Sequence, residues 1–382
     1  MKTPSRLLLD AYNALTAWRG RPKMAEATPE TGLREQREII PSGTWTDAND
    51  LARRVTDDPA GNQFSFAWKT ASLQRLSNVW LTGDQGQVYL SDGSLFKPWL
   101  APYEHVAERI KLRRPLPVGA RVIDGPVFHL TGRNHENRGH FMLQYLPRLM
   151  AAREYLKQLP DHRILVAPGH SRWQQRYLAW LGFEPERVIE GTQGTMLVRD
   201  LIFIPQLYGK AGLCPPRFYQ ELCAAAAAFP TNNGPGRPVF ITRRDAPDKR
   251  LLNEERIIEL LRARVGKVDV IELGRHSLPE QIGIFRTAPL VIGPIGQGIC
   301  NALFCQRSML VVLAPGTSGA EVYNSSHGVQ LARMCGSEGL TFLSNEPAPS
   351  RGDWSFPEDR FVMLLDRLLQ QPEASSLKTN AP

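Results

Sequence analysis

The chain has 382 residues, 42% of them hydrophobic and 22% charged, and a formal net charge of +8. This length exceeds what one ordinary hydrophobic core holds, so we expect two domains. A basic balance suggests a polyanionic partner. The arginines are scattered and no zinc-finger or RNA-binding motif occurs, which argues against nucleic acid as that partner.

Five cysteines occur, none of them in a C-x-x-C pair. We therefore expect buried free thiols in a reducing compartment, rather than disulfides or a metal site. No stretch approaches the roughly 18 apolar residues of a membrane-spanning helix. Asp10 interrupts a short leucine run near the start, which is untypical of a secretory signal. Residues 5–18 can instead form an amphipathic helix, either packed on the protein or lying on a membrane surface.

In the first half of the chain, short strands alternate with helices after an extended start. Residues 20–62 are polar and predict an extended connection, and residues 77–96 alternate around Gly-Asp and Asp-Gly, which is typical of a small antiparallel meander. Apolar runs and helical stretches follow. The predicted strands are 121–130, 163–169, 187–191 and 201–205, and the predicted helices are 137–149, 171–182 and 216–229.

Residues 229–238 form a dense cluster of proline, glycine and asparagine, which predicts an interdomain linker. After it, apolar strands alternate with helices, and this alternation predicts a parallel sheet with right-handed crossovers. In such sheets ligands bind at the carboxyl ends of the strands. The predicted strands are 239–244, 268–273, 290–293 and 309–315, and the helices are 253–264, 278–287, 299–305 and 357–370.

The predicted helix at 137–149 carries an unusual polar stripe of Asn137, His140, Gln144 and Arg148. At about 100° per residue these side chains fall within an arc of about 80°. Pro147 lies inside the same helix, where it removes a backbone hydrogen bond and favours a bend. The stripe faces either a ligand cleft or another part of the protein, and the pattern does not choose between them.

Gly293, Gly296 and Gly298 lie between a predicted strand and the next helix. Glycines there let backbone amides approach an anion at the positive end of a helix. The same pattern suits a tight turn that binds nothing. Its G-x-x-G-x-G spacing differs from the G-x-G-x-x-G of dinucleotide-binding proteins. Asn301, close behind, suits either a backbone cap or a ligand contact.

Arg243 and Arg250 lie at and just after the carboxyl end of the 239–244 strand, where guanidinium groups suit phosphate. Alternatively, they belong to a solvated surface charge run. Asn253 is a good N-cap for the helix that follows. Ser277 and Glu280 match a capping box, which explains both residues without a ligand.

Motifs that chelate metals are missing from the sequence, since no D-x-D, H-E-x-x-H or Walker motif occurs. No G-x-S-x-G nucleophile motif occurs either. We therefore expect neither a metal nor a cofactor. A bound diphosphate would have to be neutralised by arginines and helix amides.

Four motifs in this order resemble those of glycosyltransferase family 61, whose bacterial members are often labelled capsular polysaccharide biosynthesis proteins. The resemblance covers roughly residues 75–345, and three positions depart from the family's pattern. Ile295 stands in place of a histidine, Gln144 in place of an acidic residue, and 311–315 lacks a frequent glutamate. The matching residues are Asn137, His140, Leu146, Pro147, Arg148 and Leu149; Thr242, Arg243, Ala246, Arg250, Asn253 and Glu254; Ser277, Glu280, Gln281, Ile282, Phe285 and Ala288; and Gly293, Gly296, Gly298, Asn301 and Phe304.

The resemblance implies an α/β, GT-B-like fold, with two Rossmann-type domains facing a cleft and a small N-terminal β meander. It implies an inverting, metal-independent glycosyltransferase that moves a sugar from a nucleotide-sugar donor to a glycan or lipid-linked acceptor. The expected acceptor is a precursor of a cell-surface glycan. The expected parts are an N-terminal extension at 1–75, an acceptor-side domain at 76–230, a nucleotide-sugar domain at 231–345 and a C-terminal helix and tail at 346–382.

Within this hypothesis His140 is the expected base, because its unperturbed pKa lies near neutrality, and Asp245 is the alternative. Two other functions stay open, a catalytically inactive glycan- or nucleotide-binding relative and an NAD-type oxidoreductase. We expect a cytoplasmic protein, with peripheral association at the inner membrane surface as an option. The expected donor-binding residues are Arg243, Arg250, Gly296, Gln297, Gly298, Asn301 and Glu280, and the acceptor-side residues are Asn137, Gln144 and Arg148.

Overall fold

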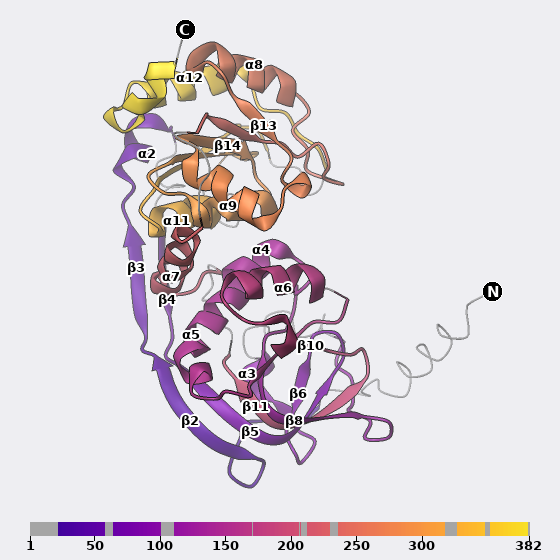
Figure 1. The fold of residues 1–382 in the computed structure, drawn as a ribbon. Coiled ribbons are helices and arrows are strands. Elements are labelled where there is room, and N and C mark those ends of the chain that lie inside the picture. Colours follow the sequence, from indigo (N-terminus) through magenta and orange to yellow (C-terminus); the bar gives the residue numbers. More distant parts are fainter. Residues whose placement is uncertain are drawn as a thin grey trace, which may run out of the picture. The chain divides into compact units, whose positions relative to one another are not determined.

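A computed structural model shows the chain as two compact units, drawn in Figure 1. The first unit comprises residues 1–43 and 69–208, and the second comprises residues 44–68 and 209–382. The helix expected at 5–18 lies outside the described residues. The structure describes residues 22–57, 64–100, 111–169, 171–205, 207, 212–229, 236–317, 327–347 and 352–380.

The first unit is built on one mixed nine-stranded sheet. Its order is β1-β7-β6-β5-β11-β8-β9-β10, and β2 pairs with β5 at the side of this path. The strands are β1 (Met24–Ala25), β2 (Leu33–Ile40), β5 (Ala71–Thr82), β6 (Gln87–Tyr89), β7 (Leu95–Phe96), β8 (Arg121–His129), β9 (Arg163–Val166), β10 (Val188–Glu190) and β11 (Thr195–Phe203).

This sheet joins an antiparallel part to a parallel part. The expected meander is confirmed as β5, β6 and β7, which pair antiparallel in sequence. Strand β5 also pairs antiparallel with β11, whereas β11, β8, β9 and β10 are parallel to one another. The unit therefore differs from a purely parallel Rossmann-type domain, because the long strand β5 brings the meander into the same sheet.

Helices of the first unit follow the parallel strands, and most were expected from apolar periodicity. Apolar side chains from both parts of the sheet, among them Val79, Leu81, Val127, Val198 and Leu201, form one buried core. The helices are α3 (Lys97–Leu100), α4 (Arg138–His140), η3 (Phe141–Tyr145), α5 (Leu146–Lys157), α6 (Ser171–Trp180) and η4 (Pro185–Arg187).

The second unit contains a five-stranded sheet in the order β13-β12-β14-β15-β16. Every pair in it is parallel, which confirms the sheet expected from the strand and helix alternation. The order is that of a doubly wound fold, in which the chain changes direction between its first and third strands. The strands are β12 (Val239–Ile241), β13 (Asp269–Ile271), β14 (Leu290–Pro294), β15 (Met309–Ala314) and β16 (Glu338–Leu343).

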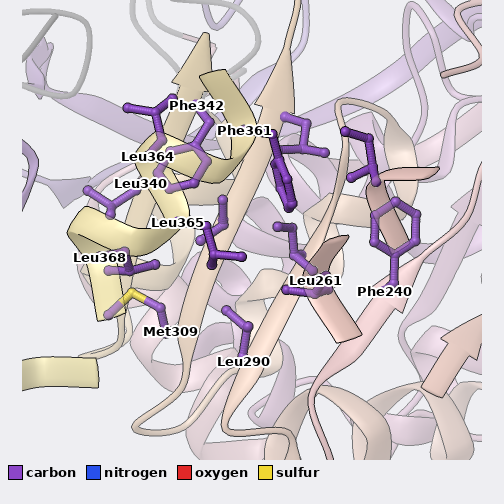
Figure 2. Close-up of a cluster of buried hydrophobic side chains, with 14 of the residues drawn as sticks. Phe240, Leu261, Leu290, Met309, Leu340, Phe342, Phe361, Leu364, Leu365 and Leu368 are labelled. Carbon is purple, nitrogen blue, oxygen red and sulfur yellow. The ribbon is translucent and has the colours of Figure 1, made fainter. Parts of the chain in front are cut away.

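Helices cover both faces of this sheet, and Figure 1 shows α8 and α12 on one face and α9 and α11 on the other. Figure 2 shows how Phe361, Leu364 and Leu365 of α12 pack with Phe240 and Leu290 of the strands. The helices are α2 (Asp50–Val55), α7 (Pro216–Ala227), α8 (Glu254–Val265), η5 (Leu273–Arg275), α9 (Leu278–Thr287), η6 (Gln297–Phe304), α11 (His327–Met334), α12 (Glu358–Leu369) and η7 (Pro372–Asn380).

Residues 44–68 belong to the second unit, although the sequence suggests only an extended connection there. Strands β3 (Gly43–Asp47) and β4 (Phe64–Trp68) pair in a two-stranded sheet. The guanidinium of Arg333 forms an ion pair with Asp47, 2.8 Å away. Asn49 caps α2 and donates a side-chain hydrogen bond to the Gly339 carbonyl. These long-range polar contacts have no signature in a single sequence.

The units divide between Tyr208 and Gly209, ahead of α7 rather than in the expected linker at 229–238. Arg286 donates to the carbonyls of Ala226 and Phe229, so the end of α7 is held by the second unit. Residues 230–235 of the expected linker lie outside the described residues. The functional division into acceptor and donor domains stays a prediction.

Two further observations concern the cysteines and the helices of the described residues. All five cysteines are free thiols, and four of them are buried. Among the helices that the structure describes, none combines the length and the apolar character needed to cross a bilayer.

Candidate functional site

The carboxyl edge of the parallel sheet brings Arg243 and Gly296 together. Arg243 follows β12 and Gly296 follows β14. Between these two strands the strand order of the sheet reverses, because β13 is added on one side of β12 and β14 on the other. An ideal Cβ on Gly296 would lie 1.7 Å from an Nη atom of Arg243, so the guanidinium lies directly against the glycine backbone. Ligands of doubly wound sheets bind in the crevice at this point of the topology.

Arg243 is half-buried and its hydrogen-bonding capacity is only partly used. One Nη donates to the Asp248 carbonyl at 3.1 Å, while the buried Nε has no partner in the structure. Burial lowers the pKa of Arg243, and the nearby carboxylates of Asp248 and Asp245 oppose this shift. A guanidinium that has lost water without gaining full compensation is a favourable place for an anion.

A buried carboxylate fixes the loop that carries Arg243. Glu254 begins α8 and is only 4% exposed. Its carboxylate accepts hydrogen bonds from the Thr242 hydroxyl at 2.6 Å and from Nε of Arg244 at 2.7 Å, and from the backbone N–H of Arg243 at 3.3 Å. The positive end of the helix also stabilises this charge. Glu254 therefore holds three consecutive residues at the end of β12 in one conformation.

Each glycine of the turn has a packing reason of its own. A Cβ on Gly293 would lie 2.6 Å from the Ile241 carbonyl oxygen, and one on Gly298 would lie 2.7 Å from the Leu273 side chain. The helix that follows, η6, is a 3₁₀-helix rather than the expected α-helix, and it begins after Gly296. Its first turn leaves backbone N–H groups without intrahelical partners, as an anion cradle requires.

Asn301 and Gln281 form a buried amide network beneath the turn. Asn301 is 4% exposed and donates to the Gln281 side chain at 3.1 Å. Gln281 in turn donates to the carbonyls of Leu273 and His276, each at 2.9 Å. The expected donor contact of Asn301 is not what this geometry shows, because the side chain is enclosed and joins η6, η5 and α9.

A cavity of about 660 Å³ opens at the same edge of the sheet, beside β12 and β13. Asp245, the alternative base, lies in its wall. Glu272, also in the wall, forms an ion pair with Arg275, in which a carboxylate oxygen lies 2.9 Å from Nε of the arginine. Such mixed charge over a concave surface suits a polar ligand with hydroxyl groups. The cavity is lined by Thr242, Arg244, Asp245, Val270, Glu272, Arg275 and His276.

Two of the expected donor-binding residues have other contacts, and a third is exposed. Arg250 is exposed and its guanidinium pairs with Asp353 at 2.6 Å. Glu280 accepts hydrogen bonds from the N–H and hydroxyl of Ser277, which confirms the capping box. Gln297 is exposed at the start of η6. The first two side chains are thus committed to structure, and the donor role of Gln297 stays a prediction.

The capping role expected for Asn253 is wrong. Its side chain makes no cap hydrogen bond to α8. Instead it donates to the Phe356 carbonyl at 2.7 Å and accepts from the Phe356 N–H at 3.0 Å. Asn253 therefore ties the start of α8 to the segment ahead of α12, a long-range contact that spacing alone does not reveal.

In the first unit, the helix at 137–157 changes its hydrogen-bonding pattern just ahead of Pro147. It runs as α4, then as a π-helical segment over Phe141–Tyr145, then as α5. The Leu146 N–H donates to the Phe141 carbonyl five residues back, so the ladder shifts by one residue just ahead of the proline. Pro147 then occupies the first turn of α5, where its missing N–H costs little. The helix therefore accommodates Pro147 through a π segment, a feature frequent at functional sites.

Arg148 lies in the core of the first unit, which corrects its expected acceptor-side position. It is 1% exposed. Its guanidinium donates to the backbone carbonyls of Ile204, His129 and Thr131 at 3.0, 2.8 and 3.4 Å. These carbonyls follow or end parallel strands, and Arg148 joins them. No direct contact with a soluble sugar is compatible with such burial.

The remaining polar residues of the stripe are also drawn inward. Asn137 caps α4 by accepting from the His140 N–H at 3.1 Å, and Gln144 is only 6% exposed. Burial lowers the pKa of His140, whereas a hydrogen bond with Gln144 and the charge of Glu136 oppose this shift. The buried Nδ1 of His140 has no hydrogen-bond partner. His140 is therefore a neutral imidazole at neutral pH with one ring nitrogen open.

Sequence reasoning assigned no site role to three residues that line the cavity, Glu272, Arg275 and His276. Glu272 and Arg275 come directly after β13, and His276 precedes α9. The signal was present in the sequence, since polar residues at a strand's carboxyl end meet those of the neighbouring strand. Among the described residues, no group of three or more histidine, cysteine, aspartate or glutamate side chains could hold a metal ion.

Comparison with known families gives one match. Residues 139–312 match the family model described as Glycosyltransferase 61. The matched range begins beside His140, includes Arg243 and the glycine turn, and ends within β15. No curated protein matches the chain.

Proposed function

Because the chain is a glycosyltransferase related to family 61, we propose that it moves a sugar from a nucleotide-sugar donor to a glycan or lipid-linked acceptor. The proposed transfer inverts the anomeric carbon and needs neither a bound metal nor a cofactor. The proposed setting is the biosynthesis of a capsular or other cell-surface polysaccharide in the cytoplasm, with the inner membrane surface as the place of the acceptor. The enclosing fold is proposed to be GT-B-like.

The contact between Arg243 and Gly296 is the observation that carries this proposal. A nucleoside diphosphate leaves with negative charge on its phosphates, and preorganised donors aimed at that charge stabilise the transition state. Arg243 supplies a partly desolvated guanidinium with an open Nε, and the start of η6 supplies helix amides. The cavity beside β12 and β13 is proposed to take the nucleoside, whose hydroxyl groups suit Asp245 and Glu272.

Direct displacement also needs a base for the acceptor hydroxyl. His140 is the proposed base, because its burial keeps the imidazole unprotonated and its Nδ1 is free to accept a proton. Asp245, exposed at the cavity, is the alternative. Asn137 and Gln144 contact His140 and are proposed to position it rather than to bind the acceptor. The Asn137 side chain accepts a hydrogen bond from the backbone N–H of His140, and the Gln144 side chain hydrogen-bonds with the His140 ring.

One observation favours a second function, binding without turnover. His140 is mostly enclosed, and its ring hydrogen-bonds with Gln144, at the position where related sequences carry an acidic residue. A catalytic base needs access to the hydroxyl that it deprotonates. Hydrolysis of a nucleotide sugar without acceptor would establish an enzyme, and binding without any hydrolysis or transfer would favour the inactive relative.

The proposed donor site is tested by titrating nucleoside diphosphates into wild type and Arg243→Ala. Loss of hydrogen bonds to a charged group should weaken binding by about 1.5–3 kcal/mol. The melting temperature should change little, because the hydrogen bond that the Arg243 side chain donates goes to the carbonyl of Asp248, an exposed residue. Arg256→Ala is the matched control, since Arg256 is exposed and pairs with Glu358 and Glu259. Equal affinity in wild type and Arg243→Ala, or equal loss in both variants, contradicts the site.

A further inference from the structure

A pair of thiols in the second unit lies away from the proposed donor cradle. Cys223 is on α7, and Cys335 directly follows α11. The Cys335 sulfur lies 3.7 Å from the Tyr219 carbonyl oxygen. In an α-helix this carbonyl accepts the N–H of the residue four positions on, which is Cys223. The Cys335 sulfur is thus held at the turn of α7 that carries Cys223.

Neighbouring contacts keep the two helices in this register. Gln220 of α7 donates a side-chain hydrogen bond to the Met334 carbonyl at 3.2 Å, one residue before Cys335. Cys223 is 8% exposed and Cys335 is partly exposed. These contacts place Cys335 beside the turn of α7 that carries Cys223, and such proximity is the first condition for a disulfide.

We propose that Cys223 and Cys335 form a reversible disulfide in response to a peroxide-type oxidant. The Cys223 thiolate attacks one oxygen of hydrogen peroxide, the O–O bond breaks, and Cys223 becomes a sulfenic acid. The departing hydroxide takes up a proton from solvent, which replaces the proton that the Cys223 thiol lost, and becomes water. The Cys335 thiol then attacks the sulfenic sulfur, forms the S–S bond, and releases a second water. Two thiols are oxidised by two electrons while one peroxide is reduced to two waters. The inference does not depend on the proposed donor.

Electrostatics support the assignment of the attacking sulfur. The hydrogen bond from Cys335 lowers the pKa of Cys223 to about 7, with further help from Gln306 and the charge of Arg286, against the effect of burial. Burial raises the pKa of the neighbouring Cys305 to about 12. A thiolate near neutral pH reacts with oxidants, and a buried neutral thiol does not. Cys223 is therefore the reactive member and Cys335 the resolving one.

The disulfide would brace the helices around the glycine turn. Helix α11 packs on η6 so closely that a Cβ on Gly328 would lie 2.2 Å from the Ile299 side chain. Cys305, at the other end of η6 from Gly296, interacts with Cys223. A disulfide from α7 to the residue after α11 would connect two helices that both pack on η6. It would also reduce the conformational entropy of the unfolded chain and so stabilise the folded protein.

The test treats the full-length protein with hydrogen peroxide and maps its peptides under non-reducing conditions. The expected product is a Cys223–Cys335 cross-linked peptide that thiol reductant removes, together with a higher melting temperature in the oxidised protein. Cys335→Ser should instead leave Cys223 as a sulfenic acid or a higher oxide, without a rise in melting temperature. Cys214→Ser is the control and should form the bond as wild type does, because Cys214 supplies neither sulfur of the pair.

Two results would overturn the proposal. The first is oxidation of Cys223 in wild type without cross-linking to Cys335. The second is a pair of thiols that both stay reduced under conditions that convert a small-molecule dithiol. Both readouts come from wild type, so they hold even where a cysteine variant folds poorly.

Discussion

The guanidinium groups of Arg148, on α5, and of Arg243, just after β12, both lie at the carboxyl ends of parallel strands, yet they have different roles. Arg148 is fully enclosed and its guanidinium donates to three backbone carbonyls. Arg243 is half-buried, lies against Gly296 and has an unpartnered Nε. The comparison teaches that position at the strand end is not sufficient evidence of a binding role. What distinguishes the two is whether the protein itself uses the donors.

The largest expected effect comes from Arg148→Met, which sharpens this comparison. The change leaves three buried carbonyls without a charged donor, at about 1–3 kcal/mol each before relaxation. We expect the free energy of unfolding to fall by about 3–5 kcal/mol, measured by denaturant unfolding. Lys157→Ala, on the exposed end of the same helix, is the control and should unfold almost as wild type does. A stable Arg148→Met protein that loses only activity would make Arg148 a binding residue after all.

His140 combines features of both arginines, since it lies on the helix of Arg148 but has an open ring nitrogen as Arg243 does. His140→Ala should lower turnover by about 10²–10⁴-fold and leave donor affinity within a few-fold, as loss of a base does. Steady-state kinetics and donor titration check this. His140→Gln should be equally slow, because an amide cannot take the proton. Near-normal turnover in His140→Gln would transfer the role to Asp245, with Asp245→Asn as the deciding variant.

The lowered pKa of His140 adds a pH test of the same role. Burial disfavours the imidazolium, so the ring stays a base at lower pH than a free histidine. The acidic limb of turnover should therefore lie below about pH 6.5, the unperturbed value. An acidic limb above that value would mean that the titrating group is favoured in its protonated form, which His140 is not.

The smallest expected effect is that of a metal chelator. This experiment tests whether Arg243 and the helix amides neutralise the charge of the diphosphate without a metal ion. Transfer should continue in excess chelator at close to its original rate. An assay with and without added Mn²⁺ or Mg²⁺ checks this. Loss of transfer that either ion restores would mean that a metal, rather than Arg243, holds the diphosphate.

The strands of the second unit could be predicted because each is a short apolar run, and such a run indicates a buried strand without any knowledge of distant contacts. VFI, LVI and MLVVLA each occur where the sequence placed a strand, and the parallel pairing follows from the helices between them. The glycine turn and Arg243 were found for the same reason, since both immediately follow such strands. The capping box at Ser277 was also local, and it is confirmed.

Long-range polar contacts could not be predicted in this way. The polar stripe of the 137–149 helix looks amphipathic, but Arg148 reaches carbonyls that lie 17 to 56 residues away in sequence. Asn253 joins Phe356, and Arg250 joins Asp353, each 103 residues away. The π segment ahead of Pro147 depends on a one-residue shift in hydrogen bonding that no periodicity reveals. Such partners are set by the tertiary fold, so residue type and spacing alone do not identify them.

Nucleoside diphosphate binding by Gly296→Ala tests the central claim most directly. The new methyl group would lie where an Nη of Arg243 now lies, so it displaces the guanidinium without removing its charge. Gly283→Ala, on α9 with nothing within 4 Å of the new Cβ, is the matched control. By titration calorimetry, we predict affinity about 10- to 140-fold lower for Gly296→Ala, which corresponds to a loss of about 1.5–3 kcal/mol, and unchanged affinity for Gly283→Ala. Wild-type affinity in a folded Gly296→Ala protein would contradict a diphosphate site at Arg243 and Gly296.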